Sequence, residues 1–229
     1  MIPKLWVKIL GPATTVAVAV TLAATREAAV ADEYGTHRVN GSIHVAPGEH
    51  SGDLSTVNGS IHIEENAVVG HVKTVNGGVD MEPHSTAADL STVNGSINLK
   101  EGAHVNGGVH SVNGTFHVEN GAEVTGDLIN TNGGIHVAAA HIGGSLGTAS
   151  GGIDLGPNAK IDGNVNMAKD TSWHFGFQTL PRVVIEPGTV VKGKLHFERP
   201  VVLYVSDRAT IGAVEGAKVQ KFSGNHPPD

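Results

Sequence analysis

The sequence predicts an all-β fold, a single-domain parallel β-solenoid (β-helix) with roughly 18–19 residues per three-sided coil and about nine coils. Three observations predict it. A phrase reading TVNGSIHI at 56–63 returns along the chain, its glycines recur at near-constant spacing, and apolar residues alternate with polar ones inside each copy. Such self-similarity indicates stacked units that bury their apolar sides only against their neighbours.

The repeated phrase sets the period of the coil. Its copies are RVNGSIHV (38–45), TVNGSIHI (56–63), TVNGGVDM (74–81), TVNGSINL (92–99), SVNGTFHV (111–118), NTNGGIHV (130–137) and TASGGIDL (148–155). The steps between successive copies are 18, 18, 18, 19, 19 and 18 residues. Asn-Gly between β segments also suggests a hairpin, so a meander of hairpins is the alternative. A solenoid explains better why each phrase returns in the same orientation.

The first 31 residues differ from the rest of the chain. Lys4 and Lys8 precede an apolar run at 9–25, and Ala29-Val30-Ala31 (29–31) has the small-x-small pattern of a signal-peptidase site. We therefore expect 1–31 to be a signal peptide and the protein to be periplasmic, exposed on the cell surface or secreted. The alternative is an uncleaved membrane anchor, the only case in which we expect a membrane partner.

Alternation inside each phrase predicts which side chains enter the core. One inward column is Ile43, Ile61, Val79, Ile97, Phe116, Ile135 and Ile153, and a second is Val45, Ile63, Met81, Leu99, Val118, Val137 and Leu155. The outward column between them is His44, His62, Asp80, Asn98, His117, His136 and Asp154. We also expect Val68 to point inward, in a third apolar segment beside a second glycine column. An aspartate at 97 should unfold the central coils, and one at 98 should be nearly neutral.

The asparagines of the phrase form a third repeated column. We expect Asn40, Asn58, Asn76, Asn94, Asn113 and Asn132 to make a ladder in which each amide bonds the next at the strand spacing of about 4.8 Å. Four of the six also read as glycosylation sequons, but the ladder explains all of them. The repeated Thr56, Thr74, Thr92 and Thr148 could form either an ice-binding hydroxyl face or ordinary strand surface.

Composition excludes several classes of function. The chain has no Cys, so disulfides, Cys-based zinc sites and thiol nucleophiles are absent. Removing 1–31 leaves 12 basic and 21 acidic residues, a formal charge of −9. An acidic surface repels phosphate, so we expect no nucleic-acid partner. We expect no cofactor either.

The repeat breaks after Met167. An insertion at about 169–180 contains Trp173, Phe175 and Phe177 and lengthens the spacing by about eleven residues before repetition resumes. These aromatics either cover a solenoid face or contact a partner. The solenoid domain is expected over 32–216 and a disordered tail over 217–229. We expect a monomer or small homo-oligomer, with a polymer as the alternative.

Two groups of motifs resemble known families. GAEVTGDL from Gly121 and VIEPGTVVKGKL from Val184 resemble the coils of bactofilins, which are polymer-forming β-helical proteins of the bacterial cytoskeleton. The TVNGSIHI phrases are similar to those of a family of adhesin-like bacterial β-solenoids. The resemblance covers roughly 38–215 and implies a fold rather than an activity, because the matches are glycine and aliphatic columns. Bactofilins are cytosolic, whereas this chain begins with an expected export signal. The export signal therefore argues against a cytoskeletal role.

The outward histidines are the candidate metal ligands. His44 and His62, and likewise His117 and His136, should lie one strand spacing apart, within reach of a shared Zn or Cu ion. The alternative is a solvated polar column. GGSLG at 143–147 matches the G-x-S-x-G nucleophile motif, but the repeat explains its glycines and no helix follows it, so we expect no enzyme. Taken together, the sequence predicts an exported structural or adhesin-like surface protein, with a bactofilin-like anchored scaffold and a metal- or ligand-binding module as alternatives; its partner is unknown.

Overall fold

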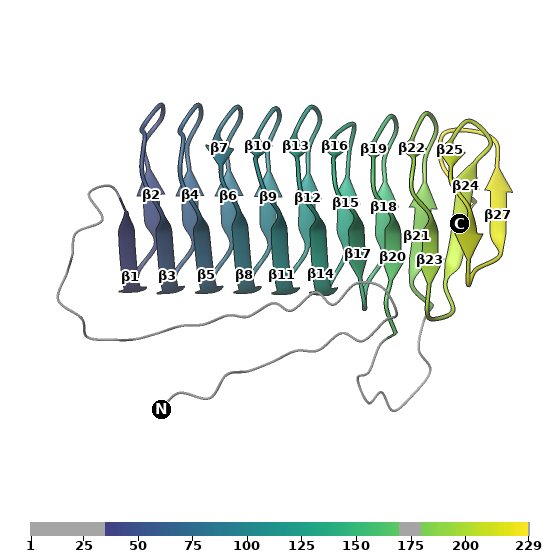
Figure 1. Cartoon of the computed structure of the whole chain (residues 1–229), viewed down its shortest axis with the longest axis horizontal. Coiled ribbons are helices and arrows are strands. Elements are labelled where there is room, and N and C mark those ends of the chain that lie inside the picture. The colour runs from purple at the N-terminus through teal and green to yellow at the C-terminus, as the bar shows by residue number, and fades with distance from the viewer. Residues whose placement is uncertain (1–34, 170–179, 229) are drawn as a thin grey trace.

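The chain forms a parallel β-solenoid, as the sequence predicts. The computed structural model describes residues 35–169 and 180–228, in which about 9 turns stack along one axis without any helix (Figure 1). Each coil runs through a strand of a first sheet, a corner that is Asn-Gly in six of the coils, a strand of a second sheet and a turn. In most coils a short strand of a third sheet then precedes the next coil.

Three parallel sheets line the three sides. The first sheet contains β1 (Thr36–Asn40), β3 (Leu54–Asn58), β5 (Val72–Asn76), β8 (Leu90–Asn94), β11 (Val109–Asn113), β14 (Leu128–Asn132), β17 (Leu146–Thr148), β20 (Val165–Met167), β23 (Leu195–Phe197) and β26 (Val214–Glu215). The second contains β2 (Ile43–Val45), β4 (Ile61–Ile63), β6 (Val79–Met81), β9 (Ile97–Leu99), β12 (Phe116–Val118), β15 (Ile135–Val137), β18 (Ile153–Leu155), β21 (Arg182–Ile185), β24 (Val202–Ser206) and β27 (Val219–Phe222). The third contains β7 (Thr86–Ala87), β10 (His104–Val105), β13 (Glu123–Val124), β16 (His141–Ile142), β19 (Lys160–Ile161), β22 (Val190–Val191) and β25 (Thr210–Ile211).

The strand register follows the sequence period. Ile61 pairs with Val79 and Ile97 with Phe116, so equivalent residues of successive phrases lie directly above one another. Across the aromatic insertion Val165 still pairs with Leu195, a step of 30 residues instead of 18 or 19. The insertion is therefore accommodated at one corner, between β20 and β21, and the stack continues beyond it.

Both inward columns are buried in one continuous core. Every member of the two columns is at most 3% exposed, which confirms the predicted alternation. The expectation for Val68 is wrong: Val68 is 37% exposed, whereas its neighbour Val69 is 5% exposed and enters the core. Val68 pairs with the outward Thr86. The segment is so short that the alternation of apolar and polar residues does not show which of the two valines faces the core.

The turn between the second and third sheets has its own repeating chemistry. Its third residue adopts a left-handed backbone even where it carries a side chain, with φ of 59° at Asn66 and 63° at Asn158. Asn tolerates this region better than most residues. The next position is small and buried, as Ala67 and Ala103 show, so each turn closes tightly over the core.

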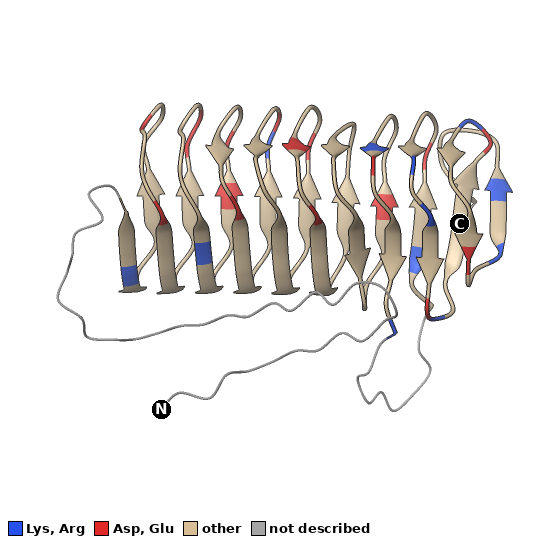
Figure 2. Cartoon of the chain, viewed as in Figure 1, with Lys and Arg blue, Asp and Glu red and all other residues tan. Residues whose placement is uncertain are grey.

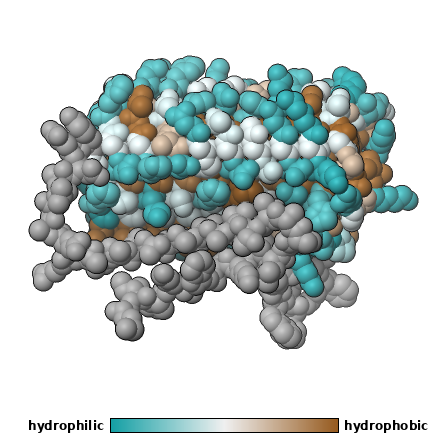
Figure 3. Space-filling model, in the orientation of Figure 1, coloured by the Kyte–Doolittle hydropathy of each residue, from teal (hydrophilic) through white to brown (hydrophobic). Residues whose placement is uncertain are grey.

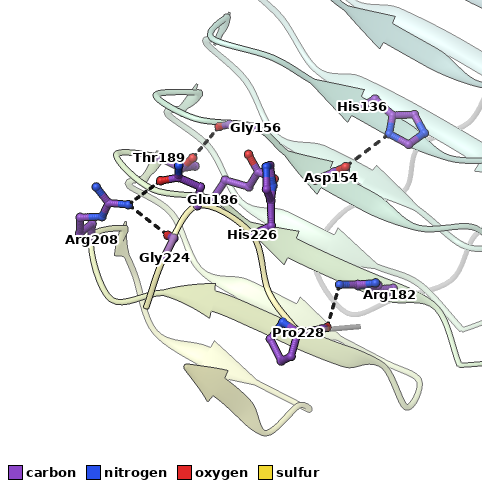
Figure 4. Close-up of polar contacts among 11 residues, drawn as sticks. His136, Asp154, Gly156, Arg182, Glu186, Thr189, Arg208, Gly224, His226 and Pro228 are labelled. Atoms are coloured by element: carbon purple, nitrogen blue, oxygen red, sulfur yellow. Dashed lines mark hydrogen bonds and ion pairs between the residues drawn. The ribbon is translucent and has the colours of Figure 1, made fainter. Parts of the chain in front are cut away.

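The C-terminal boundary lies beyond the predicted one. β27 is the last strand of the second sheet and pairs with β24, so the solenoid does not end at 216 and the expected disordered tail is wrong over this strand. After it, the chain folds back onto the preceding coils (Figure 4). The Arg208 guanidinium donates to the Gly224 carbonyl at 3.0 Å, and the His226 Nδ1 lies 3.1 Å from the Glu186 carboxylate. These contacts tie 223–228 to the end of the stack.

Candidate functional site

The asparagine ladder forms as predicted at the corner between the first and second sheets. Each amide nitrogen donates to the amide oxygen one coil earlier, at 2.9 Å for Asn58, Asn76 and Asn94. The ladder continues at 2.8 Å from Asn113 and 3.0 Å from Asn132. The strands on either side are parallel, so the hairpin alternative is wrong.

Glycine is required after each asparagine because the coils approach closely at this corner. A Cβ on Gly77 would collide with the carbonyl of Gly59, and one on Gly95 would collide with that of Gly77. The Asn-Gly phrase is therefore explained by a side chain that bonds along the stack and a neighbour that makes room for it.

The repeated threonines point inward, so both predicted surface roles, an ice-binding face and ordinary strand surface, are wrong. Thr56, Thr74 and Thr92 are at most 2% exposed, and their hydroxyls donate to the carbonyls of Gly41, Gly59 and Gly77. Thr148 is also buried and donates to Gly133 O at 3.2 Å. These hydroxyls satisfy the carbonyls of the tight corner from inside the core.

The two predicted histidine pairs are adjacent in the second sheet. His44 pairs with His62, and His117 pairs with His136. The His117 and His136 rings are stacked, with centroids 5.1 Å apart and planes 8° from parallel. Nitrogen lone pairs lie in the ring plane, so parallel rings do not converge on one ion unless a side chain rotates. Among residues 35–169 and 180–228 there is no group of three or more His, Asp or Glu that could hold a metal.

Carboxylates compete for the same histidines. His62 Nδ1 lies 3.0 Å from Asp80 Oδ2, His136 Nδ1 lies 3.8 Å from Asp154 Oδ2, and His44 Nδ1 lies 3.6 Å from Glu64 Oε1. Burial, followed by the nearby His136 and Lys100, lowers the pKa of His117. A neutral imidazole is the form that binds metal, so the lowered pKa of His117 favours metal binding at neutral pH.

A charged row on the third sheet was missed at the sequence level. Glu123 lies 3.3 Å from both His104 and His141, and His141 in turn lies 3.3 Å from Asp162. Lys192 Nζ ends the row 2.8 Å from Asp162 Oδ1. Hydrogen bonds from Lys192 and then His141 lower the pKa of Asp162. The strand register aligns His104, Glu123 and His141 with Lys160, whereas Asp162 lies two residues beyond Lys160, so no single column of the sequence marks this row.

The outward face of the first sheet carries a row of valines. The row consists of Val39, Val57, Val75, Val93 and Val112, which follow the buried threonine or its equivalent in each phrase. Val39 is 67% exposed, and the other four are partly exposed. Figure 3 shows narrow hydrophobic surface between hydrophilic rows on the face that it presents. This row is an apolar stripe along the first five coils of the rod.

Charge is divided along the rod (Figure 2). Residues 35–159 contain 12 acidic and 3 basic residues, a formal charge of −9. The described residues of 160–228 contain 5 acidic and 9 basic residues, a formal charge of +4. The rod therefore has an acidic N-terminal part and a basic C-terminal part, which the overall composition conceals.

Ser145 has a structural role in the stack. Its hydroxyl oxygen accepts a hydrogen bond from the backbone N–H of Asn164 at 3.2 Å, and its own N–H donates to Asp127 Oδ1 at 2.7 Å. Asp53 and Asp89 accept backbone N–H groups of the next coil in the same way. The match to a nucleophile motif thus falls on a column that joins coils.

Two predicted features lie outside the described residues, namely the N-terminal segment 1–31 and the aromatic side chains Trp173, Phe175 and Phe177. Within the described part of the chain, no helix is long and apolar enough to cross a membrane. Comparisons with models of protein families, with curated proteins and with solved structures give no significant match. The resemblance to adhesin-like solenoids and bactofilins is therefore supported at the level of the fold alone.

Proposed function

We propose that the chain is an exported structural or surface-interaction protein, adhesin-like in character and without catalytic activity. The observation that carries this proposal is the valine row, which places an apolar stripe on the first five strands of the first sheet. The asparagine ladder and the aspartates Asp53, Asp89 and Asp127 form hydrogen bonds between coils, which is a structural role. Surface hydrophobic residues that form a contiguous row indicate an interaction site better than isolated ones do.

Export is the first part of the proposal to test. It rests on the basic, apolar and small-residue succession of 1–31. N-terminal sequencing of protein from the producing cell should return Asp32 as the first residue. A chain that begins at residue 1 or 2 and sediments with membranes would support the anchored alternative instead.

The valine row gives the test of the interaction surface. Replacing Val75 and Val93 together by threonine keeps the side-chain shape and the strand preference but removes two apolar surfaces. We expect the native protein to co-sediment with isolated envelopes of the producing bacterium, and the double variant to bind several-fold less with a similar melting temperature. Ser91→Thr, on the neighbouring outward row of the same sheet, is the matched control. Failure of the native protein to bind envelopes would contradict the proposal.

Self-assembly is the second candidate function, and the division of charge favours it. An acidic N-terminal part and a basic C-terminal part attract each other when rods associate head to tail. Such filaments should form at micromolar concentration and low ionic strength, and should dissociate as salt screens the charges. Negative-stain electron microscopy and sedimentation velocity would show this, and a monomer at every salt concentration would exclude it.

A further inference from the structure

The asparagine ladder concentrates a reactive dipeptide on one edge of the rod. All six ladder residues are followed by glycine, at Gly41, Gly59, Gly77, Gly95, Gly114 and Gly133. Asparagine is among the thermolabile residues, and Asn-Gly is its most reactive context because glycine leaves the following backbone nitrogen unhindered. Five of the six asparagines are exposed to solvent, and Asn132 is partly exposed.

The reaction to which this dipeptide is prone is deamidation. The backbone nitrogen of the glycine attacks Cγ of the asparagine, an N–Cγ bond forms, and the Cγ–Nδ2 bond breaks. The glycine N–H proton leaves with the amide nitrogen as ammonia. Water then opens the resulting succinimide at either carbonyl, which gives aspartate or isoaspartate. Water is the co-reactant, and no oxidant or reductant takes part.

The stack restrains both partners of this reaction at the interior positions. The N–H of Gly77 donates to the carbonyl of Asn94 at 2.9 Å, and that of Gly95 donates to the carbonyl of Asn113 at 2.8 Å. The side chain of Asn94 donates to Asn76 and accepts from Asn113. An interior side chain must therefore break two amide hydrogen bonds, and its glycine a backbone one, before Cγ can meet the nitrogen.

Asn40 has one side-chain hydrogen bond instead of the two of an interior member, although the N–H of Gly41 donates to the carbonyl of Asn58 at 2.8 Å as at the interior positions. Its Oδ1 accepts from Asn58 at 2.9 Å, but within the described ranges its Nδ2 has no acceptor. It also lies on β1, the outermost strand of the first sheet. At the other end of the ladder Asn132 also keeps one side-chain bond, to Asn113, and the N–H of Gly133 donates to Ser150 at 2.6 Å. Asn132 differs from Asn40 because its strand, β14, is paired on both sides.

We propose that the ladder protects the interior Asn-Gly sites from deamidation, and that Asn40 is the site at which spontaneous modification of the folded protein begins. Local opening controls such chemistry, and a terminal coil opens more readily than an interior one. The ladder also tolerates the aspartate product better at position 40 than at position 94. A carboxylate at 40 still accepts from the Asn58 amide, whereas one at 94 loses the donor to Asn76 and faces its oxygen.

The test measures deamidation site by site. The full-length chain is incubated at mildly alkaline pH, once folded and once in concentrated urea, and each site is followed by peptide mass spectrometry with fragment ions that localise the change. In urea the six sites should react at similar rates. In the folded protein Asn40 should react first, and Asn58, Asn76, Asn94 and Asn113 at least about tenfold more slowly than in urea, because only the open form reacts. Asn98, which precedes Leu99, is the slow internal reference.

Two results would overturn the proposal. One is an interior site that reacts as fast in the folded protein as in urea, and the other is a folded-state rate at Asn40 no higher than that at Asn94. A pair of variants gives an independent check that does not depend on reaction rates. Asn40→Asp should leave the melting temperature nearly unchanged, whereas Asn94→Asp should lower it clearly, and equal melting temperatures would contradict the ladder argument.

Discussion

At the scale of single residues, Ile97 shows how strictly the alternation is enforced. Its side chain is 1% exposed and lies between those of Val79 and Phe116 in the second sheet. A carboxylate there would be buried without a partner, which costs several kcal/mol. We expect Ile97→Asp to unfold the central coils. The outward variant Asn98→Thr should change the free energy of unfolding by about 1 kcal/mol or less, because it loses a single partly exposed hydrogen bond. Thermal melting of the two variants measures the difference.

The expectation that Asn98→Asp would be nearly neutral is replaced by a different one. Asn98 Nδ2 donates to Asp80 Oδ1 at 2.6 Å, so an aspartate at 98 would place two carboxylates on adjacent strands. Like charges directly opposite each other in a sheet are destabilising. Asn98→Asp should therefore melt below Asn98→Thr, and the gap should narrow as salt is added. A gap that does not respond to salt would contradict the electrostatic explanation.

His110 makes stability depend on pH. Burial lowers its pKa below the ordinary value of 6.5, although Asp127 and Asp89 act in the opposite direction. Its Nδ1 is buried without a partner within the described chain. Below about pH 6.5 the unfolded chain binds this proton more readily, so stability falls as the pH drops from there toward the folded pKa. His110→Ser, which copies Ser91 of the same row, should reduce the loss of melting temperature between about pH 7.5 and pH 5.

His37 provides the control for this prediction. It lies in the same outward row of the first sheet but is exposed. His37→Ser should leave the pH dependence of the melting temperature close to that of the native protein. If both variants respond alike, burial of His110 is not the cause of the acid sensitivity.

At the scale of elements, an interior member of the asparagine ladder should stabilise the stack more than a terminal one. Asn94→Ala removes two side-chain hydrogen bonds, and Asn40→Ala removes one at the end of the ladder. With about 0.5–1.5 kcal/mol for each bond, the interior substitution should lower the free energy of unfolding roughly twice as much. Urea titration of both variants measures this, and equal losses would contradict the count of two bonds at an interior asparagine against one at the end of the ladder.

The histidine column predicts a weak response to zinc. Two imidazoles from His117 and His136 would bind the ion only after one ring rotates out of the stack. The melting temperature should then rise slowly with zinc concentration by mass action. Replacing both residues by glutamine should abolish that rise, whereas His37→Gln should retain it. The absence of any rise in the native protein would mean that these histidines are a solvated surface.

At the scale of the whole molecule, the two ends of the rod differ. At the first coil, β1 has β3 as its one partner among the described strands, and four of its five residues are exposed. At the last coil, the returning tail holds the end through Arg208, Glu186 and His226. A stack in which each coil contacts only its neighbours opens from its weaker end. Amide hydrogen exchange should therefore be fastest at β1, slower at β24 and slowest at β8 and β11. Uniform exchange along the rod would contradict this order.

The sequence by itself determined the period, the two inward columns and the asparagine ladder. Each of these is a residue type repeated every 18 or 19 positions, and only stacking in register satisfies all the copies together. Tertiary structure decided the features that depend on which way a short segment faces. The threonines turn inward because the glycine carbonyls at the tight corner need donors, and Val69 rather than Val68 enters the core. The charged row on the third sheet and the returning tail at 223–228 join residues about one to two coils apart. No repeated phrase marks these positions. Their contacts follow from how the coils are superposed, which the period alone does not specify.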